Sequence, residues 1–323
     1  MPKVFLGIDI SKSKFDVALL FNNKVKTKKF DNNLSGFLGL IDWLNTKEID
    51  IQMLHVCMEA TGRYSDALAN YLFEKGYQVS VVNPARIKGF ALSELSRNKT
   101  DKADAQLIGR FCQMMQPLLW QPKPKHIREL QDLVHRLEAL QNMYQQEGNR
   151  LEGKVSPYVA TSIAAVQKQL SEEINSIKKE ISNCIDIDPE LRSKKELLLT
   201  IPGIGTATIA QILAFIGNVE DFKNAKQLAA FIGLNPKRRQ SGTSIRGITR
   251  LSKIGDSRLR KAFYLPAIVA KRHNPIIKNF CERLKGTGKP AMLVIGAAMR
   301  KLVHIVYGVL RSGKPFDENL AKI

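Results

Sequence analysis

Residues 4–30, VFLGIDISKSKFDVALLFNNKVKTKKF, decide the fold of the first part of the chain because they predict three consecutive strands. Residues 4–10 and 15–21 are short apolar runs, and residues 24–30 alternate in polarity. Polar turn residues separate the three segments, a pattern typical of strands joined in a meander. One acid, Asp9, stands near the end of the first apolar run.

Helices and strands alternate after this meander. Apolar spacing predicts a helix over 35–44, and a further buried strand over 53–58 ends at Glu59. A helix is expected over 64–75, then a strand over 77–82 that Asn83 and Pro84 terminate, and then a helix over 100–115. A meander followed by alternating elements predicts an α/β sheet of mixed direction.

Two long amphipathic helices are expected beyond a linker at 120–124. Apolar residues recur at intervals of three and four from Leu130 to Tyr144 and, after a break at 153–157, from Ile163 to Ile181. Heptad-like seams of this kind occur both in hairpins within one chain and in oligomerisation arms. The sequence leaves these two interpretations open.

A helix-hairpin-helix is predicted over 197–210, with Gly203 and Gly205 in the turn. Glycines let a backbone approach a phosphate, and the N-terminal amides of the second helix attract an anion. The alternative is a tight turn between two packed helices. Further helices are expected over 259–271 and 291–310, so the last part of the chain is mainly α-helical.

The positive charge is concentrated in this last part. The 323 residues carry a net charge of +20, and residues 186–323 contain 25 basic and 10 acidic side chains against 16 and 12 in residues 1–120. We therefore expect three domains, at 1–120, 121–185 and 186–323, the third of them binding nucleic acid. No uninterrupted apolar run reaches membrane-spanning length, so no membrane partner is expected. The four cysteines form no CxxC pair and predict reduced thiols.

Four acids are the candidates for chemistry: Asp9, Glu59, Asp101 and Asp104. The first two end buried strands, and the last two share one helix face at i, i+3 spacing. Carboxylates gathered in a protein that binds polyanions need cations to neutralise them, and two divalent ions commonly support phosphodiester chemistry. Taken singly, each acid is more simply a solvated loop or cap residue, and the combination favours a site.

The order of motifs resembles the DEDD transposase and invertase family of bacterial insertion sequences, which includes the Piv-type invertases. The resemblance rests on GIDISK at 7–12, MEATG at 58–62, Asn83-Pro84, KTDKADA at 99–105, IPGIG at 201–205, AAFIGL at 229–234, SGTS at 241–244, Ile254-Gly255 and Leu259-Arg260. It covers nearly the whole chain. It implies a ribonuclease-H-like, RuvC-like N-terminal domain.

The resemblance also implies an activity. Members of the family are understood as RNA-guided recombinases, in which a bridge RNA pairs with donor and target DNA. It implies that Asp9, Glu59, Asp101 and Asp104 hold one or two Mg²⁺ ions and that Ser241 is the nucleophile. It further implies a homo-oligomer, dimer or tetramer, located in the bacterial cytoplasm on the nucleoid.

Ser241 lies in a polar loop within a basic stretch, residues 236–261, which has nine basic residues and one acid. A serine hydroxyl needs activation to act as a nucleophile, and no histidine is near in sequence. From the residues alone, Ser241 and Ser244 are more simply donors to phosphate; with the resemblance, we assign Ser241 to catalysis and Ser244 to phosphate binding. The expected backbone clamps are Arg238, Arg239, Arg246, Arg250, Lys253, Arg258, Arg260 and Lys261.

Two other functions remain compatible with the sequence. One is a non-catalytic architectural DNA- or RNA-binding protein, which would gain nothing from carboxylates near phosphates. The other is a metal-dependent junction nuclease, which would need the acids but not Ser241.

Overall fold

The computed structural model describes residues 4–21, 24–95, 100–237, 240–241, 245–246 and 250–319, with the backbone alone for residues 63, 240, 241, 245 and 246. The chain divides into two compact units, Met1–Lys123 and Pro124–Ile323. The unit boundary falls within the predicted linker. The backbone amide of Trp120 still donates to the Val79 carbonyl at 2.7 Å, so the connection begins after that residue.

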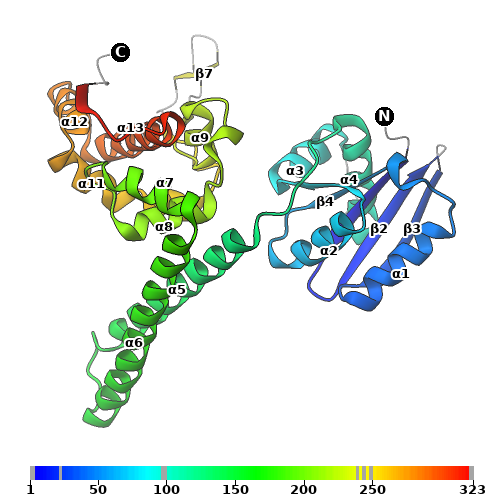
Figure 1. Ribbon diagram of the computed structural model, residues 1–323, viewed down its shortest axis with the longest axis horizontal. Coiled ribbons are helices and arrows are strands. Elements are labelled where there is room, and N and C mark those ends of the chain that lie inside the picture. Colours follow the sequence, from blue (N-terminus) through cyan, green and yellow to red (C-terminus); the bar gives the residue numbers. More distant parts are fainter. Residues whose placement is uncertain are drawn as a thin grey trace. The chain divides into compact units, whose positions relative to one another are not determined.

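The first unit is built on a five-stranded sheet of order β3-β2-β1-β4-β5. The strands are β1 (Val4–Ile10), β2 (Lys14–Phe21), β3 (Lys24–Asp31), β4 (Leu54–Glu59) and β5 (Gln78–Val82). Strands β1, β2 and β3 are antiparallel neighbours, whereas β4 runs parallel to β1 and β5 parallel to β4. This confirms the predicted mixed sheet (Figure 1).

Helices cover both faces of this sheet. Helices α1 (Leu34–Asn45) and α2 (Arg63–Glu74) pack on one core, which contains Leu6, Val17 and Leu40. Helices α3 (Pro84–Ser93) and α4 (Asp101–Met115) pack on the other, which contains Phe5 and Phe111. Alternate residues of β1 and β2 therefore face opposite cores. Helix α3 was not predicted, because Asn83-Pro84 reads as a strand stop although it caps this helix.

The second unit begins with a helical hairpin. Helices α5 (Lys125–Arg150) and α6 (Pro157–Ile187) pack against each other, and Leu140, Ile163 and Ile174 are buried. The intrachain hairpin is therefore formed, as one of the two interpretations expected (Figure 1). Leu130 and Ile181 at its base belong to the core of the helical part that follows.

The rest of this unit is mainly helical, as predicted. Its helices are α7 (Pro189–Leu199), α8 (Thr206–Phe215), α9 (Ala225–Phe231), α10 (Ser257–Ala262), α11 (Tyr264–His273), α12 (Pro275–Gly286) and α13 (Ala291–Ser312). The prediction of one helix over 259–271 is wrong: α10 ends and α11 begins around Phe263. Pro266 is the third residue of α11, and a proline, which lacks an amide hydrogen, belongs in a first turn.

Helix α13 is long and apolar enough to cross a membrane by length and composition alone. However, Val294, Leu302 and Val306 are among its residues in the core of the second unit. It is the central helix of that unit, packed by α9, α11 and α12. The four cysteines are free thiols, and Cys57, Cys112 and Cys281 are buried.

Candidate active site

Helix α4 lies in close contact with β1 at a pair of glycines. A Cβ atom on Gly7 would lie 2.1 Å from the carbonyl oxygen of Ala105 and 2.2 Å from the amide nitrogen of Gly109. A residue with a side chain at position 7 would force the helix away from the strand. This contact fixes the N-terminal turn of α4, where Asp101 and Asp104 lie, relative to β1.

The strand pairing places the other two predicted acids at one edge of the sheet. Ile8 pairs with Met58 in the parallel ladder between β1 and β4, so Asp9 and Glu59 are the next residues on neighbouring strands. Thr100 caps α4 by accepting a hydrogen bond from the amide of Ala103 at 3.2 Å. Acids in a first helical turn are stabilised by the free amides there.

The electrostatics of Asp9 show that these acids share one neighbourhood. The pKa of Asp9 is raised from 3.8 to about 6, chiefly because the side chain is partly buried and then because Asp104, Asp101 and Glu59 repel its charge. Residues from β4 and α4 therefore act on the Asp9 carboxyl group of β1. Without a cation, the fully ionised cluster is unfavourable.

A fifth acid and a lysine belong to the same neighbourhood, and the sequence analysis missed both. Asp16 on β2 lies directly opposite Asp9 and is buried, with 4% of its surface exposed. Lys29 on β3 pairs with Asp16 in the ladder, and its ammonium lies 3.1 Å from the Asp16 carboxylate and 3.5 Å from that of Asp101. An acid inside the apolar strand KFDVALLF was the signal that could have found them.

The donor chemistry of this cluster fits a hard divalent cation, because carboxylate oxygens are the ligands such ions prefer. Within the described residues, however, no three His, Cys, Asp or Glu side chains are arranged as a ready metal site. The carboxylates share one neighbourhood but do not form a ready set of metal ligands, and one of them, Asp101, is paired with Lys29.

Ser241 lies in the second unit, on a long β-hairpin rather than an irregular loop. Strand β6 (Pro236–Lys237) pairs with β9 (Arg250–Leu251), and β7 (Gln240–Ser241) pairs with β8 (Ile245–Arg246). The backbone of Ser241 is opposite that of Ile245, at the last pair before the tip. Strands of two residues are too short to show alternation, so the sequence did not reveal the hairpin. Arg238, Arg239 and Ser244 lie outside the described residues.

The predicted clamps differ in how they are held. Arg250, Lys253 and Lys261 are exposed. The Arg258 guanidinium instead donates to His135, pairs with Asp256 at 3.2 Å and lies 4.5 Å above the Phe215 ring. Arg260 donates to the carbonyls of Ile232 at 3.1 Å and Lys253 at 3.3 Å. These two arginines therefore already connect parts of the protein to one another.

The two glycines of the helix-hairpin-helix also have different surroundings. A Cβ on Gly203, whose φ is +103°, would lie 2.7 Å from the Cβ of Ala270 on α11, so this glycine is required by packing within the unit. Gly205 caps α8 from the N-terminal side and has open space where a Cβ would stand. Of the two, Gly205 is the one whose backbone another molecule can approach.

Comparison with known proteins decides the family. A transposase family model with the DEDD and IS110 designations matches residues 6–159, and one described as Transposase IS116/IS110/IS902 family matches residues 195–282. The chain is 36% identical over 321 residues to the pilin gene-inverting proteins of Moraxella lacunata and Moraxella bovis, covering 99% of each chain. The chain belongs to the IS116/IS110/IS902 transposase family. It is also 23% identical over 314 residues to the transposase for insertion sequence element IS1111A of Coxiella burnetii, covering 86% of this chain and 80% of that relative.

Family membership confirms the resemblance seen in the motifs and the predicted fold, a RuvC-like DEDD domain followed by a helical part. The protein is a DNA transposase or site-specific recombinase and acts on DNA. The non-catalytic architectural alternative is therefore set aside.

Proposed function

We propose that this transposase is an RNA-guided, Mg²⁺-dependent recombinase that cuts and exchanges DNA strands with four carboxylates and one serine. The observation that carries the proposal is the environment of Asp9. Its pKa is raised to about 6, by partial burial and by the charges of Asp104, Asp101 and Glu59. Such shifts concentrate at functional sites, and this one comes from residues on separate elements.

In this proposal Asp9, Glu59, Asp101 and Asp104 hold one or two Mg²⁺ ions. Bound there, the metal would neutralise charge that develops on a scissile phosphate. The acids bind and orient the ion, while the contact of Gly7 with α4 keeps their backbone positions fixed. Lys29 pairs with Asp16 and Asp101 and offsets part of the negative charge, to which Asp16 itself adds.

Ser241 is the proposed nucleophile. Its hydroxyl oxygen would attack the scissile phosphorus, the bond from phosphorus to a deoxyribose oxygen would break, and the serine proton would be balanced by a proton taken up by that leaving oxygen. A hydroxyl at another DNA end would then reverse the step and release Ser241. The exposed basic residues Arg250, Lys253 and Lys261, together with Arg238, Arg239, Arg246 and Ser244, would hold the DNA and RNA backbones.

Guide RNA, a dimeric or tetrameric assembly and association with the nucleoid complete the proposal. The charge of residues 186–323 supports two polyanionic partners, since it greatly exceeds that of the first unit. The amphipathic hairpin of α5 and α6 supports assembly, because Tyr144, Tyr158 and Val166 leave apolar surface exposed on it.

The test is trapping of a covalent protein–DNA adduct during plasmid inversion or excision with the native guide RNA and Mg²⁺. We expect wild type to form an adduct that disappears in Ser241→Ala. Asp101→Asn should abolish cleavage and adduct while DNA binding stays equal or becomes stronger, because a repulsive charge is removed. Cleavage by Ser241→Ala would instead support a junction nuclease, and normal recombination by Asp101→Asn would reject the metal assignment.

A further inference from the structure

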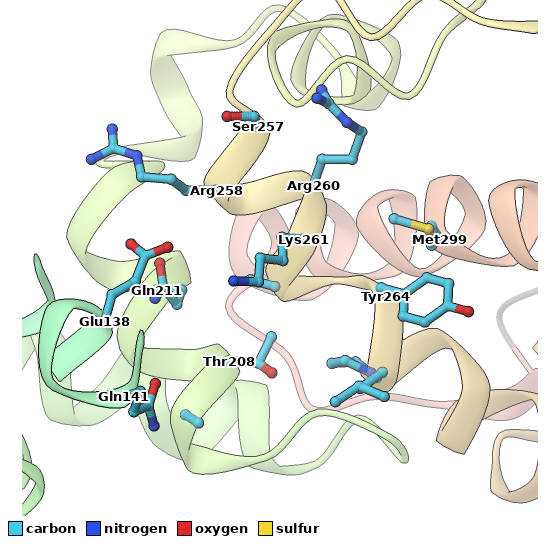
Figure 2. Close-up of a pocket in the computed structure, with 14 residues that line it drawn as sticks. Glu138, Gln141, Thr208, Gln211, Ser257, Arg258, Arg260, Lys261, Tyr264 and Met299 are labelled. Carbon is cyan, nitrogen blue, oxygen red and sulfur yellow. The ribbon is translucent and has the colours of Figure 1, made fainter. Parts of the chain in front are cut away.

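A cavity of about 700 Å³ lies in the second unit, where five helices meet. Helix α5 contributes Glu138 and Gln141, the first turns of α8 contribute Thr208 and Gln211, and α10, the start of α11 and one residue of α13 contribute the remaining wall. Figure 2 shows Glu138 and Gln211 on one side of this space and Lys261 across from them. A volume of this order suits a ligand of nucleotide size.

The cavity combines opposite charges that are not paired with each other. In the part of the chain that the structure describes, neither Glu138 nor Lys261 forms an ion pair. The two arginines of the wall are already held, Arg258 by Asp256 and Arg260 by two backbone carbonyls. A carboxylate and an ammonium thus face the same space without a partner for either.

A third polar side chain on the cavity wall is Gln211. Its side-chain oxygen is covered by the surrounding protein and, within the described part of the chain, has no hydrogen-bond partner. A buried acceptor without a donor is costly, and each such group in a native protein calls for an explanation. Beside these groups, Tyr264, Pro266 and Met299 supply an aromatic and apolar surface.

We infer that this cavity binds a single unstacked nucleotide of a nucleic-acid strand. The base edge would donate its exocyclic amine and ring N–H to the two oxygens of the Glu138 carboxylate, and its face would lie on the apolar wall. Lys261 would bind the adjoining phosphate. An acceptor-rich edge selects bases that carry an exocyclic amine, which thymine and uracil lack. This inference rests on the proposed nucleic-acid binding by the second unit and adds a preference for an unpaired base.

The experiment measures binding of the full-length protein to duplexes by fluorescence anisotropy at fixed salt. One duplex is fully paired, and the others carry one central unpaired nucleotide, guanine or thymine, in DNA and guanine or uracil in RNA. We expect the unpaired guanine to bind at least fivefold more tightly than the paired duplex and than the unpaired thymine or uracil.

Two variants test the cavity itself. Glu138→Leu should bring the ratio of affinities for the unpaired-guanine and paired duplexes close to one, while the affinity for the paired duplex stays the same or increases. Lys261→Met should weaken binding to the unpaired-guanine duplex most. The matched controls are Glu172→Leu on α6 and Lys285→Met on α12, both exposed positions, and they should keep the preference. Circular dichroism and thermal unfolding establish that each variant is folded.

The outcomes separate this inference from the proposed function. A preference in the DNA set, the RNA set or both supports the cavity and names the strand that it binds. Equal affinity for paired and unpaired duplexes by a wild type that recombines DNA overturns the cavity and leaves the function standing. A preference for unpaired guanine that survives Glu138→Leu also overturns the cavity. Failure to bind any duplex counts against nucleic-acid binding by this unit, and therefore also against the inference.

Discussion

Asp9, Asp16 and Lys29 form a row across three neighbouring strands, set by the register Asp9 opposite Asp16 and Asp16 opposite Lys29. The lysine provides a positive charge inside a cluster of carboxylates. Its own pKa is raised, chiefly through its hydrogen bond with Asp16 and the charge of that residue. In the absence of a divalent ion, Lys29 is therefore the cation that offsets Asp16 and Asp101.

Lys29→Met should increase the affinity for Mg²⁺ by about fivefold, because the variant removes a positive charge that competes with the ion for Asp101. The magnitude is that of a typical exposed ion pair. Isothermal titration calorimetry of the full-length protein with Mg²⁺ at constant ionic strength measures the change. Lys26→Met is the matched control, since Lys26 points to the opposite face of β3. Unchanged or weaker Mg²⁺ binding in Lys29→Met would show that Lys29 does not compete for the site.

Asp9→Asn should stabilise the metal-free protein above pH 6. The pKa of Asp9 is about 6 in the folded state and near 3.8 otherwise. As pH rises, Asp9 therefore loses its proton in the unfolded chain before it does so in the folded protein. This favours the unfolded state, so wild type loses stability between about pH 4 and 6. Discounted for solvent screening, the gain in Asp9→Asn is about 1 kcal/mol at pH 7.5.

Thermal unfolding in the presence of a chelator tests this gain. The gain should vanish at about pH 3 and below, where Asp9 is protonated in both the folded and the unfolded state, and it should shrink when Mg²⁺ is added. Equal stability of Asp9→Asn and wild type at pH 7.5 would show that the repulsion on Asp9 is not present in solution.

At the scale of elements, the site depends on how closely α4 approaches β1. The backbone of α4 lies against Gly7 with no room for a methyl group. The acids of α4 are short side chains, so their positions follow the position of the helix. A shift of α4 would therefore move Asp101 and Asp104 relative to Asp9.

Gly7→Ala should therefore destabilise the first unit by about 2 kcal/mol, within the range for overpacked cores, and reduce DNA cleavage at least tenfold. Gly89→Ala in α3 is the control, because a Cβ there meets nothing within 4 Å and alanine favours a helix. Urea unfolding and a plasmid cleavage assay measure both variants. Full cleavage by Gly7→Ala would show that the contact does not position the acids.

For the whole molecule, the open question is whether one chain contains a complete site. Ser241 follows the acids by more than 130 positions, and α5 and α6 intervene. The two helices fold back on each other, and Leu130 and Ile181 at their base lie in one core, so their length does not by itself separate the serine from the acids. The hairpin instead offers a surface for pairing chains, because Tyr144 and Tyr158 are exposed on it. We expect Ser241 of one protomer to act with the acids of another.

Mixing Asp101→Asn protein with Ser241→Ala protein tests this expectation. Each variant alone should be inactive, and the mixture should recover roughly a quarter of wild-type cleavage if one complete site in a randomly assorted pair suffices. Cleavage by wild-type protein, in which each pair has two complete sites, serves as the reference. A mixture that stays inactive would show that the acids and the serine meet within one chain.

Sequence patterns are enough to predict the five strands of the first unit, the mainly helical remainder, the basic C-terminal part and the acids at strand ends. Alternation of polarity, spacing of apolar residues and charge are properties of short segments, and they can be recognised from the order of residues without knowledge of the fold. Only the tertiary structure brought Asp16 and Lys29 to Asp9, since they meet through strand register. It also decided that Gly203 packs on Ala270, that Arg258 is held by His135 and Asp256, and that Ser241 lies on a hairpin. These are contacts between residues distant in sequence, and no short pattern encodes which pairs will touch.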